Sequence, residues 1–183
     1  MLKKISHFIF SLIVILTFKA CNTGLSFPGI DIPLNNQMIL ELDGRKMSTL
    51  DVSAMVVNEN SRSGVSIRSN FREGDAWSQI IMGLIVNDGY LDTKYYRFKG
   101  DCSGKKVCGK VVLYTNMLDV KPNNIFASAL PKGESIFKIT GLDFKPGGYI
   151  AGYFAAAVAG PPVRGKAINN GRFRIKLTEK LTN

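Results

Sequence analysis

Histidine and cysteine supply many of the reactive side chains of enzymes, and this sequence contains few of either. Its 183 residues include one histidine and three cysteines. The histidine, His7, lies in an apolar N-terminal run that indicates an export signal, so we expect the mature chain to contain none. Without histidine, Ser-His-Asp and Cys-His catalysis and every metal site with an imidazole ligand are excluded. The sequence therefore predicts a protein that is not an enzyme, with no catalytic residue, metal site or cofactor.

Two of the cysteines are spaced as a disulfide. Cys102 and Cys108 lie in GDCSGKKVCGK, where five residues of turn-like composition separate them between two expected strands. In an exported protein this spacing is typical of a disulfide that closes a hairpin, which stabilises a fold by about 2 kcal/mol. A redox pair more typically has the pattern C-x-x-C. We therefore predict a structural disulfide between Cys102 and Cys108.

Carboxylates leave one catalytic alternative open. Glu73 and Asp75 in REGD, and Asp88 and Asp92 in NDGYLD, could bind calcium or form a hydrolytic pair acting on glycan. Neither group has the spacing of a calcium loop, and acids beside Gly and Asn are typical turn residues. A glycan hydrolase that works without histidine stays the alternative, and two carboxylates about 5–10 Å apart in a cleft would mark it.

The N-terminus predicts export and lipid attachment. Residues 1–4 are cationic, and residues 5–18 form a mainly apolar run that is shorter than the about 20 residues of a transmembrane helix. Phe18-Lys19-Ala20-Cys21 resembles a bacterial lipoprotein box, with Phe18 where Leu is usual and Lys19 where a small residue is usual. We expect residues 1–20 to be a signal peptide, Cys21 to carry acyl chains such as palmitate, and residues 21–36 to form a tether. An unmodified cysteine behind an ordinary signal is the alternative.

The remaining residues, 37–183, predict one all-β domain. Short apolar or alternating runs follow one another at a spacing of about ten residues, and none has a helical period over eleven residues or more. This pattern favours an antiparallel β-sandwich or a partly closed barrel of about 8–10 strands. Asp43-Gly44 predicts a hairpin turn, and residues 123–130 are the best candidate for a short helix.

The net charge favours acidic partners. The formal charge is +10, and without Lys3, Lys4 and Lys19 of the leader, 21 basic residues stand against 14 acidic ones, a net charge of about +7. The basic residues are spread along the chain, and no nucleic-acid-binding motif is present, so we expect no nucleic acid as partner. Anionic lipid headgroups or glycan remain as candidate partners.

The segment GRFRIKL predicts a strand with a basic face. Alternation places Phe173, Ile175 and Leu177 on one side, in a closing pair of strands with Gly152 and Phe154, and the basic residues on the other. One interpretation is that this basic side protects a terminal edge strand against aggregation. The other is a cationic patch that includes two residues across a turn at Asn169-Asn170-Gly171. The candidate anion-binding residues are Arg164, Lys166, Arg172, Arg174 and Lys176.

Two segments resemble a family of small envelope lipoproteins of Gram-negative bacteria. The segments are ILELDGRKMSTLDVSA and SIFKITGLDFKPGGYIAGYFAAAVAGPPVRGKAINNGRFRIKL. The matching motifs are Asp43-Gly44, Gly152-Tyr153-Phe154 and Asn170-Gly171-Arg172-Phe173, and the likeness covers about a third of the chain. Met47 stands near the place where the family usually has Trp. The resemblance implies an antiparallel β fold and a surface or periplasmic location, and it implies no activity.

Together these features predict a lipid-anchored binding or structural module of the bacterial envelope. Asn22 follows the anchor instead of the Asp that retains lipoproteins at the inner membrane, which favours the outer membrane. A subunit of an envelope complex is a further alternative, which an exposed apolar patch of several hundred Å² would mark. Five aromatic residues could form a sugar-binding face, although their alternation favours packing within the sheet. They are Trp77, Tyr95, Tyr96, Tyr149 and Tyr153.

Overall fold

The computed structural model describes residues 31–59, 62–87, 89–100, 104–128, 133–145, 147–161 and 164–181. The predicted signal peptide, Cys21 and most of the tether lie outside these residues, as do Asp88 and Cys102. The predictions made for them therefore stay predictions.

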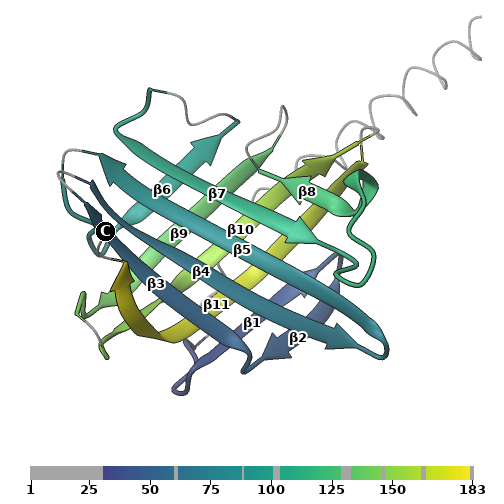
Figure 1. Cartoon of the computed structure of the whole chain (residues 1–183), viewed down its shortest axis with the longest axis horizontal. Helices are drawn as coiled ribbons and strands as arrows, with labels where there is room; N and C mark the ends of the chain where they lie inside the picture. Colours follow the sequence, from purple (N-terminus) through teal and green to yellow (C-terminus); the bar gives the residue numbers. More distant parts are fainter. Residues whose placement is uncertain are drawn as a thin grey trace, which may run out of the picture.

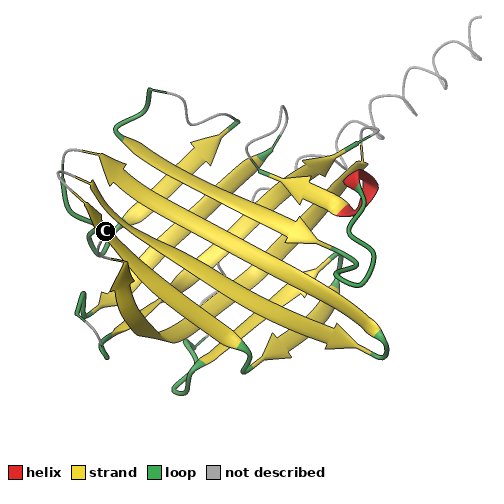
Figure 2. Cartoon of the chain, in the orientation of Figure 1, coloured by secondary structure: helices red, strands yellow, loops and turns green. Residues whose placement is uncertain are grey.

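The described chain is built from strands, with one short 3-10 helix, η1 (Figure 2). The predicted all-β class is confirmed, and the described residues form a single sheet of eleven strands where about 8–10 were predicted. The elements are β1 (Gln37–Leu42), β2 (Arg45–Thr49), β3 (Val52–Glu59), β4 (Arg62–Glu73), β5 (Ala76–Asn87), β6 (Tyr95–Lys99), β7 (Val107–Tyr114), η1 (Pro122–Asn124), β8 (Ile125–Ala127), β9 (Glu134–Leu142), β10 (Tyr149–Gly160) and β11 (Arg164–Leu181).

The sheet folds into two layers that meet at two corners (Figure 1). The first layer has the strand order β2-β1-β11-β10-β9-β6, and the second has the order β3-β4-β5-β7-β8. At one corner the C-terminal part of β11 pairs with β3, and this pair is parallel whereas the others are antiparallel. At the other corner Ala159 of β10 pairs with Ala127 of β8. A ring of strands, β11-β3-β4-β5-β7-β8-β10, therefore surrounds the core.

The core fills the space between the layers. Phe154 and Phe173 are fully buried, with their rings tilted against each other at a centroid distance of 6.2 Å. Gly152 pairs with Phe173 and Phe154 pairs with Gly171, so the predicted closing pair of strands is confirmed as β10 and β11. A residual cavity beside Phe173 measures about 10 Å³, which is about the least volume that holds a single water molecule, about 10–15 Å³. The interior at this point therefore has no room for a ligand larger than one water molecule.

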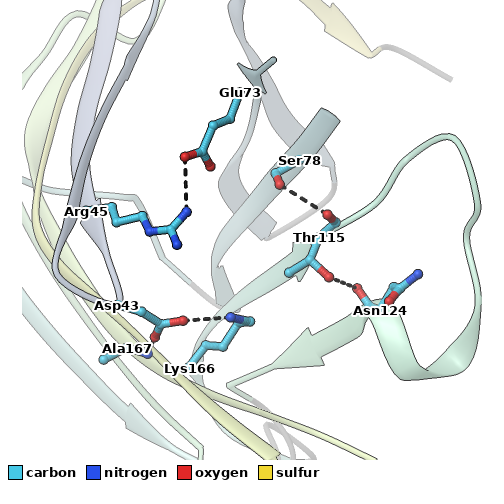
Figure 3. Close-up of polar contacts among 8 residues, drawn as sticks. All are labelled: Asp43, Arg45, Glu73, Ser78, Thr115, Asn124, Lys166 and Ala167. Carbon is cyan, nitrogen blue, oxygen red and sulfur yellow. Dashed lines mark hydrogen bonds and ion pairs between the residues drawn. The ribbon is translucent and has the colours of Figure 1, made fainter. Parts of the chain in front are cut away.

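The hairpin turn between β1 and β2 is held in place by β11. Asp43 and Gly44 form the predicted two-residue hairpin turn, and both have positive φ, 48° and 84°. The carboxylate of Asp43 accepts hydrogen bonds from the Lys166 ammonium at 2.6 Å and from the Ala167 N–H at 3.0 Å (Figure 3). This turn is thereby fixed to β11, far away in the sequence.

β11 contains a β-bulge where the sequence predicts a turn. Between Ile168 and Gly171, β11 has two residues, Asn169 and Asn170, opposite one residue of β10. Asn170 has a φ of 51°, which asparagine tolerates better than most residues. The predicted turn at Asn169-Asn170-Gly171 is therefore wrong, and β11 runs on as a single strand of 18 residues.

β11 is also not an edge strand. It pairs with β10 along one side, and with β1 and then β3 along the other. The interpretation that its basic residues protect a terminal edge is therefore wrong, because β11 has no exposed edge over this stretch. The edges of the first layer are β2 and β6.

The predicted helix at residues 123–130 is limited to the single 3-10 turn of η1. Pro122 begins this turn, and the chain then becomes extended to form β8. Phe126 of β8 pairs with Leu113 of β7 and is buried in the core. Residues 125–127 are therefore extended, because they pair with β7 and bury Phe126 in the core.

Candidate functional site

The outer face of the first layer brings together cations and aromatic rings from separate strands. Register places Arg172 of β11 opposite Tyr153 of β10, Tyr153 opposite Lys138 of β9, and Lys138 opposite Tyr95 of β6. Directly opposed residues point to the same side of a sheet, and neighbouring strands are about 4.7–4.9 Å apart. Cation and aromatic ring thus alternate along a line across four strands, which we call the Arg–Tyr line.

The same face has a strong excess of positive charge. Its basic side chains are Lys46, Arg97, Lys99, Lys138, Arg172, Arg174 and Lys176, and its acidic ones are Glu41 and Glu134. Both acids are engaged by neighbours, because Arg97 donates to Glu134 and the Asn170 amide donates to the Glu41 Oε2 atom at 2.8 Å. The hydrogen bond that Arg97 donates to the Glu134 carboxylate raises the pKa of Arg97. Among the described residues, no ion pair compensates the charges of Arg172, Arg174 or Lys176.

Of the tyrosines on this face, Tyr149 is covered by a cation and Tyr95 is exposed. Arg174 lies over the ring of Tyr149, with its guanidinium carbon 3.9 Å from the ring centroid, so this cation is held flat against the sheet. The Tyr149 ring in turn covers Gly141, where a Cβ atom would lie 3.0 Å from the ring. Tyr95 is 52% exposed at the edge of the layer. The face therefore presents both a fixed cation and an accessible aromatic ring.

The other two aromatic candidates lie elsewhere. Tyr96 is buried, and its hydroxyl accepts from the Asp92 N–H and donates to the Asp92 carbonyl, each at 3.0 Å. Burial raises the pKa of the Tyr96 phenol, although the bond from the Asp92 backbone lowers it. Trp77 belongs to β5 in the second layer, where Arg72 lies 5.5 Å from its ring centroid. Tyr96 therefore packs in the interior, Trp77 lies on the other layer, and neither extends the Arg–Tyr line.

A pocket opens at the β1 and β2 side of the same face. It has a volume of about 200 Å³ and is lined by Ile39, Leu40, Glu41, Lys46, Asn170 and Arg172. The Nε atom of Arg172 is shielded from solvent and has no hydrogen-bond partner among the described residues. A buried donor without a partner costs about 1–3 kcal/mol, and more when the group is charged. The pocket is therefore lined by a residue, Arg172, whose guanidinium carries one shielded N–H without a hydrogen-bond partner.

Two of the five predicted anion-binding residues lie outside this face. Because the β11 bulge inserts one residue, Arg164 and Lys166 share the side of Ile168, which is buried, instead of the side of Arg172. Lys166 is ion-paired with Asp43 and lies 5.6 Å from the ring centroid of Phe126. The predicted patch that joins Arg164 and Lys166 to the row of β11 is therefore wrong. Arg172, Arg174 and Lys176 do share one face, as predicted.

The sequence did not indicate the residues that complete the site. Lys138 comes from β9, Lys46 from β2, and Glu41 from β1, so none is close to β11 in the sequence. The break in alternation at Asn169-Asn170 was the available signal, since Ile168 and Phe173 are both buried although five positions separate them. A strand without a bulge would place them on opposite faces.

Two of the carboxylates considered for catalysis, Glu73 and Asp92, make local contacts. Glu73 ends β4 before a turn at Gly74 and Asp75, and it forms an ion pair with Arg45 at 3.1 Å (Figure 3). Asp92 accepts a hydrogen bond from the N–H of Thr93 at 2.6 Å. No group of three or more potential metal ligands occurs among the residues that the structure describes.

The remaining candidate site is the disulfide. Cys108 lies in β7 and is disulfide-bonded. Its predicted partner, Cys102, lies outside the described residues, so the pairing stays a prediction.

Comparisons of the chain with protein-family models, with curated proteins and with solved structures give no significant match. Within the described ranges, no helix is long and apolar enough to cross a membrane.

Proposed function

We propose that this protein is a lipid-anchored module of the bacterial envelope, on the outer membrane, whose first layer binds anionic lipid headgroups or glycan. The export signal and Cys21 of the sequence support the anchor, and Asn22 supports the outer membrane. The observation that carries the binding role is the Arg–Tyr line on a face whose two acids are already engaged.

The physical basis of this role is electrostatic attraction combined with flat aromatic contacts. Each Lys or Arg near an anionic membrane surface contributes about 1 kcal/mol of attraction, which decays within a Debye length. Tyrosine rings present flat amphipathic surfaces to sugar rings or headgroups. The anchor would hold the domain near such a surface, so modest affinity of the face is sufficient for occupancy.

One feature favours a protein partner as a second candidate. Met55 of β3 and Ile85 of β5 lie on the outer face of the second layer and are 37% and 38% exposed. They flank Gly64 and Ser66 of β4, which are small. A subunit of an envelope complex would use this second face, so the two candidates make opposite predictions about which layer matters.

Charge removal on each layer in turn separates a binding face on the first layer from attraction by net charge alone. In the chain carrying Cys21→Ser, replacing Arg172, Arg174 and Lys176 with Gln should weaken binding to phosphatidylglycerol vesicles or lipopolysaccharide about a hundredfold at low salt. The loss should shrink as salt rises, because screening removes the same attraction. Co-sedimentation at several salt concentrations measures both effects.

The matched control replaces Arg62, Arg68 and Lys110, which are exposed on the second layer, with Gln. It removes the same three charges and should change binding by no more than about threefold. Equal losses in both triple variants would show attraction by net charge alone and contradict a binding face on the first layer.

A further inference from the structure

We infer that the pocket beside Arg172 is a subsite for a phosphorylated sugar unit, an inference that rests on the proposed binding face and names its ligand. The pocket is bounded by β1, β2 and the β11 bulge, at one end of the Arg–Tyr line. Its lining combines two cations, one carboxylate and one side-chain amide with two apolar residues, Ile39 and Leu40.

The cations of the pocket define the anionic part of the ligand. Arg172 contributes a guanidinium whose Nε–H lacks a partner, and Lys46 contributes an exposed ammonium. A guanidinium offers its N–H groups in a planar fork that matches the oxygens of phosphate, and a lysine adds a second positive charge. A phosphate group in the pocket would therefore be attracted by both cations, the Arg172 guanidinium and the Lys46 ammonium.

The carboxylate of Glu41 defines the other part of the ligand. Asn170 donates to its Oε2 atom at 2.8 Å and so holds the carboxylate in place. In the strand register, Glu41 of β1 lies opposite Lys46 of β2. A carboxylate repels a bare phosphate and accepts hydrogen bonds from hydroxyl groups. The pairing of cations with a fixed carboxylate therefore selects a ligand that carries phosphate and hydroxyls together.

The size of the pocket agrees with a single sugar unit. Its volume of about 200 Å³ lies below the about 300–1,000 Å³ of pockets that enclose a drug-sized molecule. It exceeds the space of one water, about 30 Å³, several times over. A phosphate with one attached ring fits this range, and the rest of a longer glycan would continue along the Arg–Tyr line.

Isothermal titration of the mature full-length protein in nonionic detergent tests the subsite. The probes are glucose 1-phosphate, glycerol 1-phosphate as the soluble equivalent of a phospholipid headgroup, and glucose. We expect glucose 1-phosphate to bind about tenfold more tightly than either of the others. Arg172→Gln should weaken it about tenfold or more, whereas Arg68→Gln, the same charge change on the outer face of the second layer, should change it less than about twofold.

Glu41→Gln distinguishes the two roles of the carboxylate by the sign of its effect. If Glu41 accepts hydroxyls, the variant should bind glucose 1-phosphate about fivefold more weakly. Tighter binding would mean that Glu41 only repels the phosphate, and would overturn the sugar assignment. Equal affinity for glycerol 1-phosphate and glucose 1-phosphate would overturn it as well. The melting temperature of each variant reports whether it is folded. If Arg172→Gln does not fold, Arg172→Lys is used in its place.

Failure of the subsite and failure of the binding face give different results. If the wild-type protein binds vesicles through the first layer but does not bind glucose 1-phosphate, the subsite is ruled out and the binding face stands. If both triple variants lose vesicle binding equally while glucose 1-phosphate still binds through Arg172, the binding face is ruled out and the subsite stands.

Discussion

Replacing Phe173 with alanine is expected to lower the free energy of unfolding by about 3–5 kcal/mol. The ring is 0% exposed, packs against Phe154 at 6.2 Å, and lies opposite Met38 of β1 and Gly152 of β10. The new cavity cannot collapse easily, because β11 is hydrogen-bonded on both sides at this position. Denaturant titration measures the loss as a shift of the midpoint at constant slope.

Leu118→Ala is the control for this prediction. Leu118 lies in a loop and is 75% exposed, so its truncation should change stability by no more than about 0.5 kcal/mol. A loss below about 1 kcal/mol in Phe173→Ala would contradict the assignment of Phe173 to the core between the layers.

Replacing Cys21 with serine is expected to move the protein completely from the membrane fraction to the soluble fraction. Two or three acyl chains hold a lipoprotein stably, at about 0.8 kcal/mol for each buried CH₂, and serine offers no thiol for attachment. Intact-mass measurement of the wild-type protein should show acyl chains on a chain that begins at Cys21. The membranes are washed at about 1 M salt, where the Debye length is about 3 Å, so that the cationic face does not retain the variant.

Asn22→Ser is the control for the anchor, because it changes the adjacent residue and keeps the thiol. It should remain in the washed membrane fraction. An unmodified mass with a different N-terminus in the wild-type protein, or retention of Cys21→Ser after the salt wash, would rule out attachment through Cys21.

Local patterns predicted those parts of the fold that local chemistry determines. Asp43-Gly44 has the backbone freedom that a two-residue hairpin turn requires, and the turn forms where predicted. The alternation of Phe173, Ile175 and Leu177 follows from strand geometry, and all three are buried. These features depend on neighbouring residues, so that a single sequence contains enough information for them.

The β11 bulge is the feature of this strand that the sequence did not predict. Asn170 with positive φ, together with Gly171, produces a turn in many hairpins, and the local sequence does not distinguish a turn from a bulge. Packing decides between them here. A Cβ atom at Gly171 would lie 2.4 Å from the Phe154 ring, which shows how closely β10 and β11 approach each other. The face on which Arg164 and Lys166 lie depends on this one inserted residue.

The candidate site could not be predicted as a whole because it is assembled by pairing between distant strands. Lys138 and Tyr95 reach the face only because β9 joins β10, and β6 joins β9. The pocket beside Arg172 needs β1 and β2 on the other side of β11. The sequence identified the basic side of β11, and the tertiary pairing determines which neighbours complete it.

The most direct test of the proposed binding face locates the surface that contacts the ligand. Ser48 of β2 and Ser53 of β3 are both exposed, and register places them on the outer faces of the first and second layers, respectively. Each is replaced with cysteine in the chain carrying Cys21→Ser and labelled with a polarity-sensitive dye, which changes no charge of the protein's own side chains. On addition of phosphatidylglycerol vesicles or lipopolysaccharide, we expect the dye at position 48 to shift to the blue and to become protected from aqueous iodide, while the dye at position 53 stays unchanged. Protection at position 53 without protection at position 48 would contradict a binding face on the first layer.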